Sequence, residues 1–429
     1  MEDSGHSNPH KASCTLPPEK VFSIQLGSEV FRLSGASIAS DAPSYFSRFF
    51  EEQLRCTKAA NVRTLYIDRD PETFREIARH LQGYHVRPRD GAQFVKLFAD
   101  SQFYTLPRLM SQLFESEIFI EIGDRHFRIA RDIFSGPGDS PNFFSLGFGA
   151  FFASPDEVFP GLERKGLLRP PAIVPASVPS RSADTFAELL HILRGYPLDI
   201  RNEFHRGELL RDCRYFHLRG LEQKLIPYKI VVNPFNQQSE ITIRLEDVKP
   251  SGILVTPKIV ASGSVVGGTV MYARPFTDDN ASHLILQISG ESTLIDPKDL
   301  TANFIGQTKT RMASLINFMG KKMDIPESQI RGLPLRFRLG LETDLTIDGK
   351  GDHPLESTLR AGPGTNENLP PVKRQRVEAT EDGPWVVRTG QWRLHLLAQA
   401  NDTYEVILCA VKLDIYTSQR TRVQARDFI

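Results

Sequence analysis

A stretch near the N-terminus of this chain recurs later in the sequence, and the repeat constrains the fold more than any other feature. Ile24–Leu33 (IQLGSEVFRL) matches Ile120–Ile129 (IEIGDRHFRI), in each case a short alternating strand, a glycine turn and a second strand. Phe74–Val86 likewise matches Phe186–Leu198. The repeat covers roughly 100 residues, whereas solenoid units span only ~20–50 residues. It therefore predicts one small domain used twice.

The two copies differ by an insertion. The opening strands are displaced by 96 positions and the central helices by 112, so the second copy has 16 more residues between them. Asp100–Leu109 (DSQFYTLPRL) is also displaced by 112 positions, onto Asp212–Leu221 (DCRYFHLRGL). The insertion falls in the proline-rich stretch 152–180, and we expect a surface loop there because lengthening a loop costs little closure entropy.

Each copy is predicted to combine a strand hairpin with helices. In the first copy we expect strands over Val21–Leu26, Val30–Leu33 and Thr64–Ile67, a helix over Ala36–Phe50, and two later helices over residues 94–99 and 106–114. Asp70 is placed to cap a further helix, because Pro71 suits the first helical position. Apolar residues then follow at helical spacing (Phe74, Ile77, Ala78 and Leu81).

From about residue 228 the pattern changes to short alternating runs separated by turns. These runs predict strands, with one helix over Phe304–Phe318 and a closing hairpin of Trp392–Ala398 and Tyr404–Ile415. The predicted fold class is therefore α+β. It comprises a disordered tail over 1–19, two α/β domains over 20–115 and 116–227, and a β-rich domain over 228–429 with a disordered loop at about 348–384.

Composition excludes several classes of function. The 52 basic and 52 acidic residues cancel, which argues against direct binding of nucleic acid, since that requires a basic field. We expect no membrane association and no secretory signal, because no apolar run reaches ~18–20 residues and the first residues are polar. The four cysteines form no C-x-x-C pair, so we predict neither a disulfide framework nor a metal or cofactor site.

The stretch 64–86 (TLYIDRDPETFREIARHLQGYHV) resembles the BTB/POZ domain of the potassium-channel-tetramerisation type, and 21–33 (VFSIQLGSEVFRL) is similar to its opening strand pair. The resemblance covers residues 20–114 and, more weakly, 117–226, where Ser180-Arg181-Ser182 replaces the Asp-Arg-Asp signature. The whole layout resembles soluble fungal-type proteins with tandem BTB/POZ domains and a β-rich C-terminal region.

The resemblance implies that the first copy is an assembly module, with Asp68, Arg69, Asp70 and Phe74 as candidate interface residues. Two interpretations of the Asp-Arg-Asp run remain open. It could make polar contacts across an oligomer interface, or it could supply a helix cap and an ion pair within one molecule.

Two other segments carry a functional interpretation beside a structural one. Six phenylalanines lie between residues 143 and 159, and we expect them to fill the core between the copies rather than to bind a partner. In PVKRQRV (371–377), the basic residues Lys373, Arg374 and Arg376 resemble a monopartite nuclear-import signal, although a solvated charge run on a loop is the alternative. The import interpretation predicts a nuclear or cytoplasmic protein.

We predict a non-enzymatic interaction scaffold, because no G-x-S-x-G, H-E-x-x-H or phosphate-loop motif occurs. By resemblance it self-associates through BTB/POZ and is either a substrate adaptor, with a cullin-type ubiquitin ligase and a client as partners, or a nuclear regulator. The alternative is a ligand-binding or enzymatic β-rich domain, in which Trp385, Trp392 and His395 line a pocket and the BTB/POZ pair only oligomerises the chain.

Overall fold

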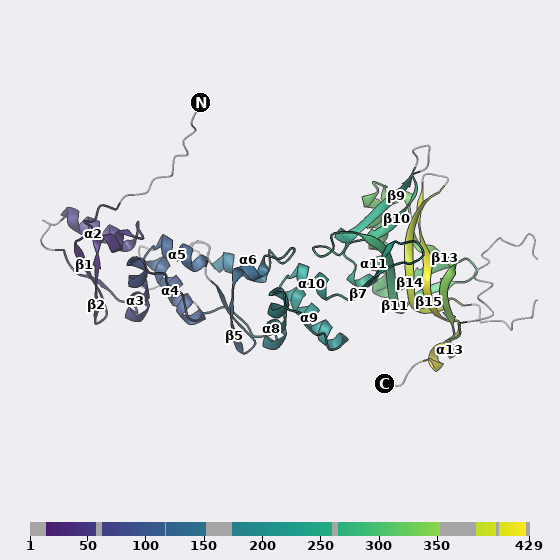
Figure 1. The fold of residues 1–429 in the computed structure, drawn as a ribbon, viewed down its shortest axis with the longest axis horizontal. Coiled ribbons are helices and arrows are strands. Elements are labelled where there is room, and N and C mark those ends of the chain that lie inside the picture. Colours follow the sequence, from purple (N-terminus) through teal and green to yellow (C-terminus); the bar gives the residue numbers. More distant parts are fainter. Residues whose placement is uncertain are drawn as a thin grey trace, which may run out of the picture. The chain divides into compact units, whose positions relative to one another are not determined.

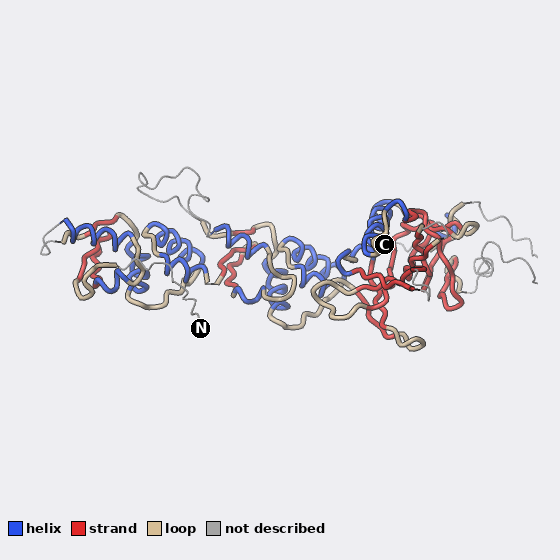
Figure 2. Tube along the Cα trace, turned by 90° about the horizontal axis from the view of Figure 1, so that it is seen from above, coloured by secondary structure: helices blue, strands red, loops and turns tan. Residues whose placement is uncertain are grey.

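The computed structural model describes residues 14–56, 62–115, 117–151, 174–259, 265–351, 383–399 and 403–425. These fall into two compact units, Met1–Leu221 and Glu222–Ile429. The first unit holds most of the helices and the second most of the strands (Figures 1 and 2). The sequence predicts disorder over 1–19 and about 348–384; residues 1–13 and 352–382, and most of the insertion (152–173), lie outside the described residues. Residues 14–19 are ordered against the first segment, with Leu16 buried and the Thr15 amide donating to Glu51.

The first unit begins with a three-stranded sheet. Strand β1 (Val21–Leu26) pairs antiparallel with β2 (Glu29–Ser34) and parallel with β3 (Leu65–Ile67), which confirms the predicted hairpin. Gly27 has a φ of 55° in the hairpin turn, where a Cβ would be strained. Because side chains alternate along β1, Phe22, Ile24 and Leu26 form one fully buried face.

Five helices belong to this segment: α1 (Gly35–Ala39), α2 (Tyr45–Cys56), α3 (Pro71–Leu81), α4 (Gly91–Phe103) and α5 (Pro107–Phe114). The single helix expected over Ala36–Phe50 is wrong, because Pro43 has no N–H to continue α1. A second helix begins instead beside Ser44, whose hydroxyl accepts from the Ser47 amide at 3.2 Å. Phe46, which lies on α2, is fully buried.

The second segment of this unit repeats the same order of elements. Its sheet runs β5-β4-β6, from β4 (Ile118–Ile122), β5 (Arg125–Ile129) and β6 (Ser177–Val178), again with one antiparallel and one parallel pairing. The helical elements are η1 (Arg131–Phe134), α6 (Phe143–Phe151), α8 (Ala183–Leu193), α9 (Glu203–Tyr215) and α10 (Arg219–Leu225).

The start of the phenylalanine-rich stretch belongs to the core of this second segment. The Phe144 ring stacks on Phe134 at 5.0 Å and Phe216 at 5.1 Å, and Phe143 contacts Phe216 at 5.6 Å. Phe143 and Phe144 are therefore core residues rather than exposed ones. They belong to the core of the second segment, however, and not to a core between the two copies as expected. The side chains of the other four phenylalanines lie outside the described residues.

The second unit is a nine-stranded sheet with the order β7-β8-β11-β12-β13-β15-β14-β10-β9. Its strands are β7 (Tyr228–Val232), β8 (Ser239–Arg244), β9 (Ile253–Ile259), β10 (Val265–Tyr272), β11 (Ser282–Asp296), β12 (Thr301–Phe304), β13 (Ile330–Ile347), β14 (Trp385–Ala398) and β15 (Tyr404–Tyr416). β11 also pairs with β14, which closes β11, β12, β13, β15 and β14 into a ring. The expected closing hairpin is confirmed as the β14–β15 pair.

Helix α11 (Gly306–Lys322) connects β12 to β13, where the sequence predicted the helix of this region. Short helical turns complete the unit: η3 (Leu245–Asp247), η4 (Pro250–Gly252), η5 (Glu327–Gln329) and α13 (Gln419–Gln424). The core contains Phe337 and Trp392, whose rings meet edge to face at 6.1 Å.

Candidate assembly surface

The Asp-Arg-Asp run links β3 to α3, and its last residue caps the helix. The Asp70 carboxylate accepts from the Glu72 amide at 3.2 Å and from the Thr73 hydroxyl at 2.6 Å. Burial opposes the ionised form, but these hydrogen bonds outweigh it and hold the pKa of Asp70 below its usual value. Asp70 therefore has a structural role at the start of α3 while its side chain stays exposed.

Arg69 points into the domain. Its guanidinium pairs with Asp100 of α4, with side chains only 15% and 7% exposed, and lies 4.8 Å from the centroid of the Phe103 ring. Burial raises the pKa of Asp100 to about 6, although the Arg69 charge acts in the opposite direction. These contacts favour the interpretation of Arg69 and Asp70 as an ion pair and a helix cap within one molecule.

The second segment contains the same arrangement 112 positions later. Arg181 pairs with Asp212 at 3.1 Å and lies 4.1 Å from the centroid of the Tyr215 ring. Ser182 caps α8 by accepting from the Thr185 amide at 3.3 Å. The inward arginine is therefore common to both segments. The exposed carboxylates are specific to the first, because serines occupy their positions in the second.

Phe74 lies in the core of the first segment. It is fully buried, and its ring contacts Phe31 at 4.9 Å, Phe46 at 5.6 Å and Tyr104 at 5.8 Å. Phe74 has no exposed surface for another molecule, and its ring packs α3 against the core of the segment.

Three exposed apolar side chains of the first segment lie together on the open face of its sheet. Val21, Val30 and Tyr66 are 59%, 53% and 60% exposed, and Val30 and Tyr66 flank Gln25 in register on neighbouring strands. Asp68, also exposed, follows directly after β3. We call these five residues the open sheet face. The alternation in the sequence places Tyr66 on the face opposite the buried Leu65 and Ile67, so strand alternation alone predicts that Tyr66 is exposed.

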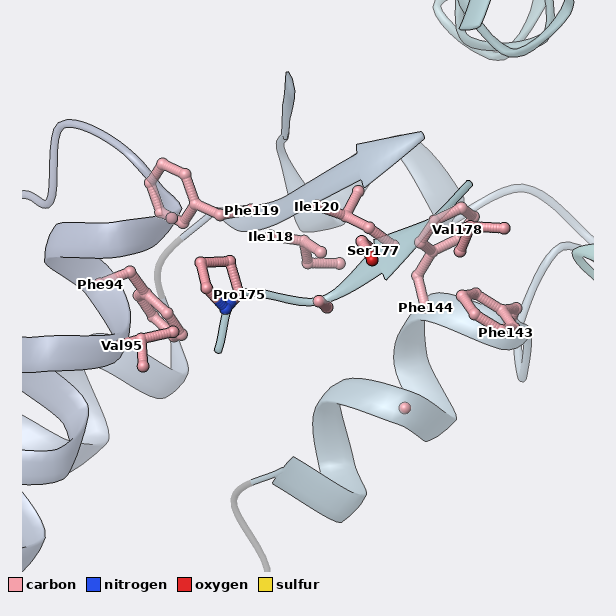
Figure 3. A pocket seen from close by; sticks show the side chains of 13 residues that line it. Phe94, Val95, Ile118, Phe119, Ile120, Phe143, Phe144, Pro175, Ser177 and Val178 are labelled. Carbon is pink, nitrogen blue, oxygen red and sulfur yellow. The ribbon is translucent and has the colours of Figure 1, made fainter. Parts of the chain in front are cut away.

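The corresponding face of the second sheet is covered only at Phe119, whereas His126, Arg128 and Ser177 on the same face are exposed. Phe119, which is 96 positions after Ser23, packs on Phe94 of α4 with ring centroids 5.5 Å apart. A Cβ added to Gly91 would lie 3.4 Å from Pro175, so this approach is close. An apolar cavity of about 140 Å³ remains beside the contact, between α4 and the second sheet (Figure 3). The second sheet thus contacts α4 through Phe119 and exposes polar side chains elsewhere on this face, whereas the first sheet exposes Val30 and Tyr66.

Comparison with known proteins identifies the first segment. The chain matches the family description "BTB/POZ domain" over residues 22–114. Residues 22–114 form a BTB/POZ domain. The match agrees with the resemblance deduced from the Asp-Arg-Asp-Pro run, and BTB/POZ domains are modules of protein–protein interaction.

Two relatives from the yeast Saccharomyces cerevisiae match a larger part of the chain. The uncharacterized protein YDR132C is 38% identical over 249 residues, which is 56% of this chain and 49% of that protein. The BTB/POZ domain-containing protein YLR108C is 32% identical over 241 residues, which is 56% of this chain and 47% of that protein. The chain thus spans about half the length of these relatives. No solved structure matches it.

The remaining candidate residues lie elsewhere. Trp392 is fully buried and Trp385 nearly so, which places both in the core of the second unit rather than around a pocket; His395 is half-buried on β14. The basic run with Lys373, Arg374 and Arg376 lies outside the described residues. Within the described part of the chain, no helix is long and apolar enough to span a membrane, and no three histidine, cysteine or acidic side chains gather as metal ligands.

Proposed function

We propose that this protein is a non-enzymatic interaction scaffold. Its BTB/POZ domain, of the potassium-channel-tetramerisation type, assembles the chain, and its C-terminal unit holds a client protein. The observation that carries the proposal is the open sheet face of a domain whose family serves protein–protein contact. Exposed apolar side chains grouped on one face are typical of interaction surfaces.

The second segment is, in this proposal, a divergent BTB/POZ copy in tandem with the first. Its element order, strand pairing and Arg181–Asp212 ion pair support that assignment. On its own sheet, His126 and Ser177 occupy the positions of Val30 and Tyr66, so the apolar open sheet face of the first segment is the better surface for a contact between chains. The two copies divide their roles: the first assembles and the second packs against it.

The open sheet face can be tested by its effect on native mass. We expect the wild-type chain to exceed its monomer mass of 48.3 kDa in light scattering coupled to gel filtration. Tyr66→Glu places a charge on the open sheet face and should yield monomer. Tyr84→Glu is the matched control, because Tyr84 is 61% exposed in the same domain but does not lie on that sheet. A monomeric wild type, or an unchanged mass for Tyr66→Glu, would contradict the proposal.

The scaffold takes one of two cellular forms, an adaptor that brings a client to a cullin-type ubiquitin ligase or a nuclear regulator. Affinity purification of the full chain from its native cells separates them. A co-purifying cullin supports the adaptor. Its absence, together with nuclear accumulation that is lost on replacing Lys373, Arg374 and Arg376 by alanine, supports the regulator.

A further inference from the structure

We propose that the C-terminal unit binds an acidic, extended peptide segment of its client on a basic face of the sheet. This inference rests on the proposed function, because it names the chemistry of the client. The basic face consists of Lys258 on β9, His283 on β11, Arg336 and Arg338 on β13, and Arg393 and His395 on β14.

Strand register places these side chains on one face. On β14 the buried residues are Trp392, Leu394 and Leu396, so Arg393 and His395 point to the opposite side. Arg338 and Arg393 both lie in register with Cys409 of the intervening β15, and Arg336 and His395 both lie in register with Ile407. Two rows of basic side chains therefore cross three neighbouring strands.

The remaining two basic residues, His283 and Lys258, share this face by register. His283 pairs with Met271, two positions from the Thr269 that pairs with His395. Lys258 pairs with Gly267, which pairs with Leu397, two positions from His395. Burial lowers the pKa of His395, and the nearby charges of Arg393, His283, Arg338 and Lys258 lower it further. Basic side chains from four strands thus lie around His395, although the chain as a whole has no net charge.

Part of this positive charge is unpaired. Arg393 is held by Glu240 at 2.7 Å, and Arg336 pairs with the buried Glu405. Among the described residues, Lys258 and Arg338 have no ion-pair partner, and both side chains are exposed. Because exposed arginine recognises carboxylates through paired hydrogen bonds, an acidic side chain is the complementary ligand.

An acidic peptide fits the face better than a nucleic acid does. Glu240 and Glu405 lie among the cations and would repel a continuous phosphate backbone. Single-stranded nucleic acids also stack their bases on aromatic side chains, and the named positions of the basic face carry none. An extended peptide lies along a pleated surface and can place alternate carboxylates near Arg338 and Lys258 while avoiding both glutamates.

The test measures fluorescence anisotropy of a labelled peptide of about twelve residues, in which glutamates alternate with serines, titrated with the full-length chain. We expect binding that weakens as salt rises, and a loss of about 3–10-fold in affinity for each of Arg338→Glu and Lys258→Glu. Neither substitution breaks an ion pair, so folding should be retained, with tryptophan fluorescence as the check. Lys309→Glu on α11 is the control, because it makes the same charge change at an exposed site on another element.

A labelled single strand of about twelve thymidylates provides the competing ligand class. Tighter binding of that strand would overturn the peptide assignment in favour of nucleic acid. No binding of the glutamate peptide, or equal losses for Lys309→Glu and Arg338→Glu, would overturn the basic face as the site. Native mass is measured on the same samples, so a failure of self-association is distinguished from a failure of peptide binding.

Discussion

Replacing Arg69 by methionine should destabilise the first unit in a pH-dependent way. Methionine keeps much of the apolar stem of the arginine but leaves Asp100 buried without its cation. Removing one partner of a buried ion pair costs about 3–5 kcal/mol. The cation–π contact with Phe103 is lost as well, and such contacts contribute about 0.5–2 kcal/mol. At about pH 8 we therefore expect the free energy of unfolding to fall by about 3.5–7 kcal/mol.

The sign of the pH dependence follows from Asp100. Its pKa in the folded protein, about 6, is above the ~3.9 of an unfolded chain, so its contribution to stability is present at low pH and is lost as pH rises through about 6. Without Arg69 the folded pKa rises further, and a protonated Asp100 needs no cation. The difference between Arg69→Met and wild type should therefore be small at about pH 5 and largest at about pH 8.

The assay is urea unfolding followed by circular dichroism at 222 nm, which reports mainly the helices of the first unit. Both tryptophans, Trp385 and Trp392, lie in the second unit, so their fluorescence transition serves as an internal reference and should not move. The double substitution Arg69→Met with Asp100→Leu should recover most of the lost stability, because it removes the unpaired charge.

Two results would refute this reasoning. An equal loss at the two pH values would mean that lost packing, not an unpaired carboxylate, sets the effect. A double variant no more stable than Arg69→Met would mean that the unpaired Asp100 carboxylate does not cause the loss of stability. Arg181→Met should repeat the pattern in the second segment, because Arg181 contacts Asp212 and Tyr215 in the same way.

Three further predictions concern other parts of the chain. Asp70→Ala and Ser182→Ala each remove a helix cap and should each lower stability by about 1 kcal/mol, measured by circular dichroism. Gly252→Ala should cost about 1–3 kcal/mol in the tryptophan-fluorescence transition, since its Cβ would lie 2.2 Å from the Ala273 carbonyl oxygen. Ile230→Lys, on the exposed edge strand β7, should change stability by less than about 0.5 kcal/mol and reduce aggregation seen by light scattering.

The sequence was informative wherever local pattern decides structure. Alternation along Val21–Leu26 predicted the first strand, and the Asp70-Pro71 pair predicted the start of α3. Local pattern failed at Ala36–Phe50, where apolar residues at helical spacing concealed the break at Pro43. The break produces two short helices, α1 and α2, in place of one. The helical spacing of apolar residues does not show where one helix ends and the next begins.

The candidate surfaces were harder to predict from the sequence than the helices and strands. Phe74 has the spacing of a family motif, and only its ring contacts show that it is a core residue. Tyr66 could have been found from strand alternation. The basic face could not, because strand order in the second unit departs from chain order and brings β14 between β15 and β10. The residues of the basic face are separated in the sequence by up to 137 positions, from Lys258 to His395.

The sequence by itself determined the repeat, the BTB/POZ character of the first segment and the change to strands near residue 228, because these depend on short-range spacing. It also aligned Asp100 with Asp212. Only the tertiary structure showed that each aspartate meets an arginine 31 positions earlier, and that Phe119 of the second sheet packs on Phe94 of α4. Such contacts depend on how helices and sheets pack, and a one-dimensional pattern does not contain that packing.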